Sequence, residues 1–187
     1  MMNATLLFAV LSSINILGDV GQKNKPVDPK EWGQSLNGFQ LAVFVTKETF
    51  ETNEPVSVVL VISNITDHAF SIGKADANIC YKFTVLDIAG KQVPMTSFGE
   101  HSQRFIEGSW VVPFTLKGHE TDKSQFELSK FYDVSKPGKY SLFVSRRVPV
   151  FSTEATGAEP KQTAHYTNII SNTLEFSVRA AKGFAPL

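Results

Sequence analysis

The side chains able to do chemistry in this sequence are few, and no spacing among them matches a catalytic motif. The 187 residues contain four histidines and one cysteine. Three of the histidines stand beside an acidic residue, in the pairs Asp67-His68, Glu100-His101 and His119-Glu120. Adjacent residues of a strand face opposite sides, so such a pair can chelate a metal only within a loop. We expect solvated loop histidines, with a zinc or copper site as the alternative.

The other common catalytic signatures are absent from the sequence. It contains no G-x-S-x-G turn, no glycine-rich phosphate loop and no His-Glu-x-x-His zinc motif. Cys80 shares a strand face with Lys82 and Thr84, opposite Tyr81 and Phe83, and we expect it to be a packed cysteine. The sequence therefore predicts a protein that is not an enzyme and that holds no cofactor and no metal.

The composition excludes several further classes of protein. The 18 Lys and Arg residues balance 18 Asp and Glu residues, without a block of like charges. A chain of this kind lacks the basic surface of a nucleic-acid binder and the polybasic anchor of a peripheral membrane protein. One cysteine excludes a disulfide scaffold. The length suits a single domain, which we expect to be a monomer.

The elements that must position any site are strands, because apolar residues alternate along most of the chain. Alternating rows occupy residues 39–45, 56–62, 79–85, 110–116, 126–128, 140–144 and 174–178. A further short strand at 91–95 pairs with the third row across a turn at 88–91. Seven or eight antiparallel strands in roughly 140 residues predict an all-β fold, a two-sheet immunoglobulin-like sandwich. A closed barrel is the alternative.

Several residues predict finer details of this sandwich. The row at 56–62 is apolar on both faces, which indicates a central strand. Pro113 cannot donate to a strand ladder, so its strand belongs at a sheet edge or on a bulge. Asn64 is the turn residue that ends its strand, and Tyr140 follows a Pro-Gly turn, where a tyrosine corner is expected.

The ends of the chain differ from the body in composition. Residues 6–17 form an apolar run of about twelve residues, shorter than the roughly 20 that cross a membrane and suited to a signal peptide. We predict a signal peptide at 1–18, a linker at 19–37, the sandwich at 38–180 and a tail at 181–187. The protein is then exported, to the periplasm, cell surface or medium, with no membrane span. A cytosolic tail or a mis-assigned start is the alternative.

Two segments resemble known proteins. Residues 38–41 and 51–58 resemble the opening of exported bacterial β-sandwich modules, of macroglobulin-like domains and of the intracellular proteinase inhibitor family of bacilli, with Asn53 where those commonly have Gly. Residues 126–140 resemble the L-S-x-x-Y-D-x-S-x-P-G-x-Y run of uncharacterised exported sandwich proteins and of the region preceding deuterolysin-type zinc peptidases. Over residues 38–179 the resemblance implies a sandwich fold and an exported setting. Peptidase activity is not implied, because the zinc motif is missing.

The segment at 149–169 is the most informative irregularity. It joins two strands over about twenty residues, whereas hairpin loops usually close in two to five. We predict a binding loop there, with an extended β-ribbon or a disordered insertion as alternatives. The residues expected to rim this loop mix cationic and aromatic groups: Arg146, Arg147, Phe151, His165 and Tyr166. Residues 96–108 form a second irregular region.

The sequence thus favours a non-catalytic, exported binding or accessory module. Its long loops would recognise a protein or a carbohydrate partner. One alternative is a protease inhibitor that presents a sandwich loop to its target. The other is a metal-binding protein or an enzyme.

Overall fold

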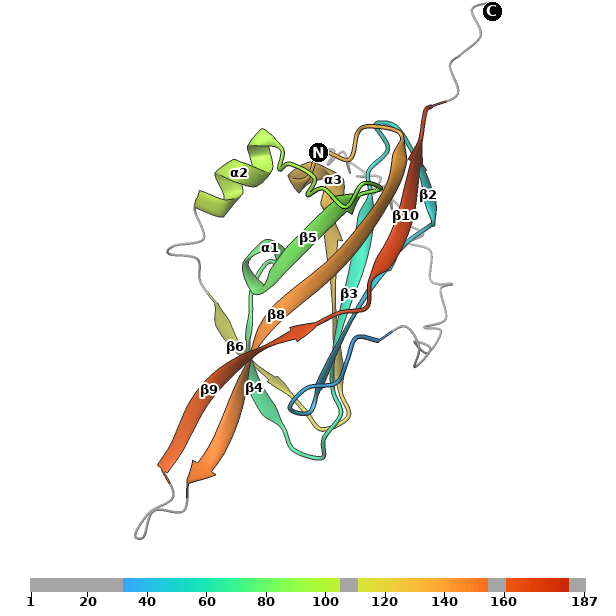
Figure 1. Ribbon diagram of the computed structural model, residues 1–187. Helices are drawn as coiled ribbons and strands as arrows, with labels where there is room; N and C mark the ends of the chain where they lie inside the picture. Colours follow the sequence, from blue (N-terminus) through green and yellow to red (C-terminus); the bar gives the residue numbers. More distant parts are fainter. Residues whose placement is uncertain (1–31, 105–110, 155–160, 182–187) are drawn as a thin grey trace, which may run out of the picture.

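The computed structural model describes residues 32–104, 111–154 and 161–181, which form ten strands and three short helices (Figure 1). The strands are β1 (Phe39–Val45), β2 (Thr49–Glu51), β3 (Ser57–Asn64), β4 (Phe70–Lys74), β5 (Tyr81–Asp87), β6 (Val112–Leu116), β7 (Thr121–Glu127), β8 (Gly138–Glu154), β9 (Lys161–Ile170) and β10 (Leu174–Arg179). The helices are α1 (Ala77–Cys80), α2 (Ser97–Arg104) and α3 (Leu128–Phe131). The predicted signal peptide, most of the predicted linker and residues 182–187 lie outside the described residues. None of the described helices is long and apolar enough to span a membrane.

The strands form two main sheets, which confirms the predicted all-β sandwich. One sheet has the order β1-β3-β7, and the other has the order β2-β10-β8-β5, with β9 also paired to β8. Strands β4 and β6 form a separate two-stranded sheet. Strands β2 and β10 run parallel, which departs from the antiparallel prediction. The chain leaves the first sheet after β1 and joins the second through β2, which brings β2 alongside β10.

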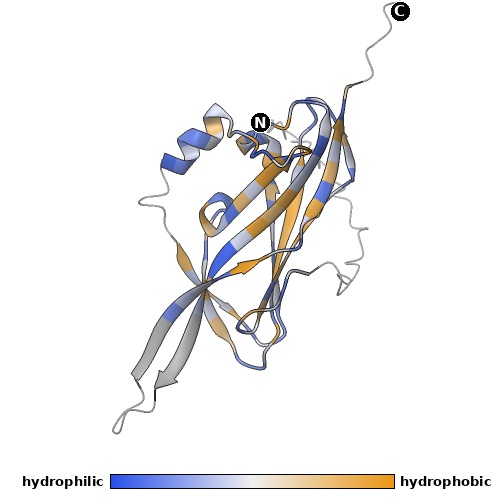
Figure 2. Ribbon diagram, in the orientation of Figure 1, coloured by the Kyte–Doolittle hydropathy of each residue, from blue (hydrophilic) through white to orange (hydrophobic). Residues whose placement is uncertain are grey.

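The hydrophobic core lies between the two main sheets. Strand β3 is central in its sheet, as predicted, and its inward residues Val58, Leu60 and Ile62 are fully buried. Across the layers, the rings of Phe83 on β5 and Phe126 on β7 stack with centroids 4.1 Å apart. Figure 2 shows hydrophobic residues concentrated in β3 and alternating with polar ones along β5 and β8. This alternation leaves one face of the second sheet free for other contacts.

The edge position predicted for Pro113 is also confirmed. Among the described strands, β6 pairs only with β4, where Pro113 lies opposite Gly73. The short strand predicted at 91–95 is reduced to a bridge between Leu86 and Gln92 and a hydrogen bond from the backbone N–H of Val93 to Val85. Its brevity leaves Gln92 free to line the surface described below.

Three helices replace parts of the predicted strands and loops. Residues 77–80 form α1, so the third strand begins at Tyr81 and not at Ile79. In the second irregular region, the Thr96 hydroxyl caps α2 by accepting a hydrogen bond from the Gly99 N–H at 3.0 Å. Gly99 packs against α3 so closely that an added Cβ would lie 2.3 Å from the carbonyl oxygen of Phe131. Helices of one or two turns leave no period in a window of a dozen residues.

The predicted binding loop at 149–169 is, in its described part, an extended β-ribbon. Strands β8 and β9 pair from Ser145↔Ile170 to Glu154↔Lys161, and residues 155–160 lie outside the described residues. Figure 1 shows the ribbon projecting beyond the sandwich. The sequence of the ribbon lacks the alternating apolar pattern that marks the other strands, so periodicity did not reveal it. The extended β-ribbon, one of the two alternatives given for this segment, is therefore the conformation of its described part.

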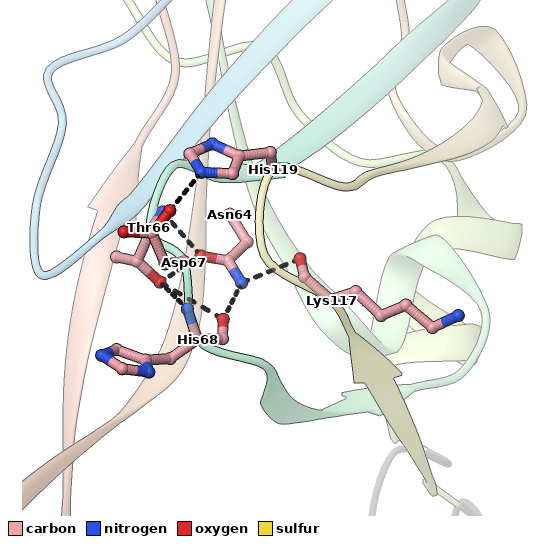
Figure 3. A network of polar contacts seen from close by, with 6 residues as sticks. All are labelled: Asn64, Thr66, Asp67, His68, Lys117 and His119. Atoms are coloured by element: carbon pink, nitrogen blue, oxygen red, sulfur yellow. Dashed lines mark hydrogen bonds and ion pairs between the residues drawn. The ribbon is translucent and has the colours of Figure 1, made fainter.

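Side-chain hydrogen bonds close the ends of the sandwich. Asn64, fully buried, donates from Nδ2 to the carbonyls of His68 at 2.6 Å and Lys117 at 2.9 Å, and accepts on Oδ1 from the Thr66 N–H and hydroxyl (Figure 3). Asn64 therefore ends β3, as predicted, and ties the turn after β3 to the turn before β7.

The opposite end of the sandwich confirms two further expectations. The Tyr140 hydroxyl donates to the carbonyl of Lys136 at 2.7 Å, which is the predicted tyrosine corner. Asn53 has a φ of 69°, in the left-handed region that glycine adopts without strain. Asparagine tolerates the left-handed region better than other side chains do.

Candidate functional site

The candidate site is a cavity of about 400 Å³ over β5, β8 and β9, bounded by residues of α1 and α2. Figure 1 shows α1 beside β5, with α2 farther out on the same side. Its polar lining consists mainly of amides and cations: Asn78, Lys82, Gln92, Gln103, Arg147 and Asn168. Its apolar floor includes Ile79, Cys80 and Met95.

The register of three strands places the central residues of this cavity on one face. Lys82 on β5 lies opposite Ser145 on β8, and Arg147 lies two residues farther along β8. On the other side of β8, Asn168 lies opposite Arg147. Residues two apart on a strand share a face, and directly paired residues share it too, so these four side chains form one surface. Lys82, Arg147 and Asn168 are exposed on it.

Arg147 and Tyr166 form a stacked pair on this face. Tyr166 is the diagonal neighbour of Arg147 across the ribbon, because it pairs with Pro149. The Arg147 guanidinium lies over the Tyr166 ring, 4.3 Å from its centroid. The ring remains 57% exposed. A guanidinium over an aromatic ring makes a cation–π contact, and its N–H groups can still donate to a ligand.

The charged residues that line the cavity all carry positive charge. Its described lining contains Lys82 and Arg147 but no Asp or Glu. Among the described residues, neither cation has a carboxylate within ion-pair distance. A second cavity, of about 350 Å³ at the end of the sandwich, has the opposite character, with Glu54, Glu127 and Asp133 and without Lys or Arg in its lining. The two cavities thus differ in the sign of the charged residues that line them.

Arg146 does not lie at a binding rim as predicted, because its side chain points into the sandwich. It is 4% exposed, and its Nη1 and Nη2 donate to the Tyr81 hydroxyl and the Gly73 carbonyl, both at 2.5 Å. Burial raises the pKa of Tyr81, although the Arg146 charge acts in the opposite direction. Arg146 and Arg147 are neighbours in the chain, so strand alternation sends one inward and the other outward.

The remaining predicted site residues separate in the same way. His165 is exposed but lies next to Tyr166 in β9, so it belongs to the opposite face of the ribbon. The backbone of Phe151 pairs with Ala164, and its side chain lies outside the described residues. Of the four whose side chains the structure describes, it brings together only Arg147 and Tyr166.

Sequence reasoning missed Lys82, Asn168 and the amides from the two helices. The alternation of Lys82 with Tyr81 and Phe83 already predicted an outward lysine. What that pattern lacked was the strand register that sets Lys82 beside Arg147, about 60 residues farther along the chain. The positions of Asn78 and Gln103 depend on α1 and α2, which were not predicted.

The histidines and the cysteine show no cluster of ligands among the residues that the structure describes. No group of three or more His, Cys, Asp or Glu side chains there could hold a metal ion. Asp67 and His119, from two different predicted pairs, form an exposed ion pair at 2.8 Å (Figure 3). The hydrogen bond from His119, and then its charge, lower the pKa of Asp67. Cys80 is half-buried and packs against the core, with Sγ 3.7 Å from the carbonyl oxygen of Ala75.

Comparisons with known proteins give similarities of fold only. No family model matches the chain, and no curated protein matches it. The C-terminal domain of Wzt is similar over 84% of this chain and 83% of its own, with a TM-score of 0.47 and 11% identity. A β-glucosidase from Listeria innocua, solved with isofagomine, is similar over 79% of this chain but only 17% of its own, with a TM-score of 0.39 and 17% identity. Neither similarity is strong enough to indicate a ligand or an activity, and the resemblance to inhibitor and macroglobulin-like families stays a prediction.

Proposed function

We propose that this protein is an exported, non-catalytic module that binds a carbohydrate in the cavity over β5, β8 and β9. The observation that carries the proposal is the surface formed by the Arg147–Tyr166 stack and the amides beside it. Ligand sites combine an apolar floor with a few polar groups that fix orientation, and this cavity has both.

A carbohydrate suits this surface better than a protein does. Each amide of Asn78, Gln92, Gln103 and Asn168 offers a donor and an acceptor side by side, which matches the hydroxyl groups of a sugar. The exposed Tyr166 ring offers an apolar face to the C–H groups of a sugar ring. Protein interfaces instead place large apolar anchors at their centre and are depleted in lysine, whereas Lys82 lies near the middle of this surface.

The other parts of the proposal rest on the sequence. Export is supported by the apolar run within residues 1–18, whose length matches that of a signal peptide. A non-catalytic role is supported by the missing hydrolase and zinc-peptidase motifs. Mass spectrometry of the mature N-terminus would test export directly, and a protein that retains residue 1 would contradict it.

A glycan microarray followed by isothermal titration calorimetry tests the binding proposal. We expect the wild-type protein to bind a subset of polysaccharides and Arg147→Ala and Asn168→Ala to weaken that binding, by about tenfold each if one good hydrogen bond is lost. Arg179→Ala is the matched control, since Arg179 is an exposed arginine of the same sheet outside this cavity. Equal loss in the control variant, or no binding to any glycan on the array, would refute the proposal.

A protease inhibitor is the second candidate, and the projecting ribbon favours it. Inhibitors insert an exposed segment into the protease cleft, and Figure 1 shows β8 and β9 reaching beyond the sandwich. Replacing residues 152–163 with Asn-Gly would close the ribbon after the Phe151↔Ala164 pair and keep the Arg147–Tyr166 stack. An inhibitor would lose stoichiometric inhibition of serine or cysteine proteases in this variant. A carbohydrate-binding module would keep its affinity for the glycan.

A further inference from the structure

The geometry points to an acidic glycan as the ligand, with its anionic group held between Lys82 and Arg147. This inference rests on the proposed carbohydrate-binding function and names the class of sugar. A carboxylate, as in a uronic acid, and a sulfate ester present the same chemistry to two cations, and the experiment below separates the two.

The spacing of the two cations suits one shared anion. Lys82 pairs with Ser145, and Arg147 is the next residue of β8 on the same face. Diagonal neighbours of this kind lie roughly 7–8 Å apart at the backbone. Ser145, the residue between them on this face, is too short to obstruct an anion, and the flexible lysine stem can extend toward the guanidinium that lies over Tyr166.

The surroundings of the pair reinforce its charge. The described lining has no acidic residue, and α1 and α2 contribute only neutral groups such as Asn78 and Gln103. A concave surface lined by one sign of charge concentrates its potential on a ligand of the opposite sign. The second cavity is lined instead by three acidic residues, Glu54, Glu127 and Asp133.

Arg147 is already oriented for this task. Its contact with the Tyr166 ring already restricts the guanidinium, so less side-chain freedom is lost when it donates to an anion. Carboxylates and sulfates accept charge-assisted hydrogen bonds from such a fork of N–H groups. Asn168, opposite Arg147, is then placed beside the anion, where its amide meets the neighbouring hydroxyl of the sugar.

Titration of the full chain with four polymers tests the inference. Polygalacturonate carries carboxylates and dextran sulfate carries sulfates, while carboxyl-reduced polygalacturonate and dextran are their neutral counterparts. We expect one or both anionic polymers to bind and the neutral polymers to bind at least tenfold more weakly. Lys82→Gln and Arg147→Gln should each reduce affinity for the anionic polymer about tenfold, because each removes one charge-assisted hydrogen bond. Binding should weaken as salt is added.

Glu127→Gln and polyglutamate serve as controls. Lys82→Gln lowers the net charge by one and Glu127→Gln raises it by one, while Glu127 lies in the other cavity. If Glu127→Gln strengthened binding by the same factor by which Lys82→Gln weakened it, the net charge of the protein, and not the cavity, would determine affinity for the anionic polymer. That result would overturn the inference. So would competition by polyglutamate as strong as that by the glycan. Equal affinity for the neutral polymers would overturn the acidic class while the carbohydrate proposal stands, and the absence of binding to any glycan would overturn both.

Discussion

Replacing Asn64 with alanine should destabilise the protein strongly although it changes only one small side chain. Asn64 is fully buried and makes five contacts at 3.2 Å or less, three from Nδ2 and two to Oδ1. Net hydrogen bonds contribute about 1 kcal/mol each, and a buried group left without a partner costs about 1–3 kcal/mol. Of the three carbonyls, that of Leu116 is buried, whereas those of His68 and Lys117 can turn to water.

We therefore expect Asn64→Ala to lower the free energy of unfolding by about 3 kcal/mol. For a domain of this size, that corresponds to a fall in Tm of roughly 6–12 °C. Urea unfolding followed by far-UV circular dichroism, together with scanning calorimetry, measures both quantities. Asn168→Ala removes an exposed asparagine and should stay within about 0.5 kcal/mol of wild type.

The isosteric variant Asn64→Asp makes the test sharper. Its carboxylate would face the carbonyls of His68 and Lys117, to which it cannot donate, and burial with these oxygens would raise its pKa in the folded state. The folded state then binds a proton more tightly than the unfolded state does, so stability falls as pH rises above about 4. Asn64→Asp should be weakest at neutral pH and should recover toward pH 4. If Asn64→Ala costs less than about 1 kcal/mol, or Asn64→Asp is as stable as wild type at pH 7, the hydrogen-bond reasoning is wrong.

Three further predictions concern single polar contacts. Tyr140→Phe keeps the ring but removes the corner hydrogen bond, and should lower the free energy of unfolding by about 1 kcal/mol; an unchanged urea midpoint would contradict it. Arg146→Ala leaves a buried hydroxyl and a carbonyl without their donor and should lower the free energy of unfolding by about 2–4 kcal/mol. It should not alter glycan affinity at temperatures where the variant is folded, and weaker binding by the folded variant would show that Arg146 contributes to the site. His119→Gln should raise the pKa of Asp67 toward its ordinary value of 3.8, as followed by NMR titration. Because the pKa of Asp67 is depressed in the folded state, the ion pair stabilises the fold above that value and ceases to do so as pH falls through the folded-state pKa; an Asp67 pKa that is the same in both proteins would rule out the pairing.

Local patterns in the chain predict the sandwich well because burial between two sheets imposes a period of two on every core strand. The central position of β3 followed from residues 56–62 being apolar on both faces. The edge position of β6 followed from the missing N–H of Pro113. The corner at Tyr140 followed from the Pro-Gly turn before it. Each of these features depends on residues close together in the sequence.

The ribbon and the helices were less accessible to such reasoning. The residues of β8 and β9 in the projecting ribbon do not alternate in polarity, so periodicity gives no strand signal there. Helices α1 and α3 are four residues long, and α2 is eight, too short for a helical period to emerge. Their placement against the sheet depends on contacts such as the close approach of Gly99 to α3.

The sequence by itself predicted most of the core strands, although not β2 or β4, and indicated a cationic and aromatic group of residues around 146–166. Only the tertiary structure decided which of those residues share a surface. Alternation along β8 places Arg146 in the core and Arg147 on the outer face. The register of the neighbouring strands places Lys82 and Asn168 beside Arg147, and the sequence around those two residues does not indicate that register. Register is a property of the whole sandwich, because a slip of one residue would move every core side chain to the solvent face. The candidate site is therefore a consequence of how the core packs, and its residues are brought together from three strands and two helices.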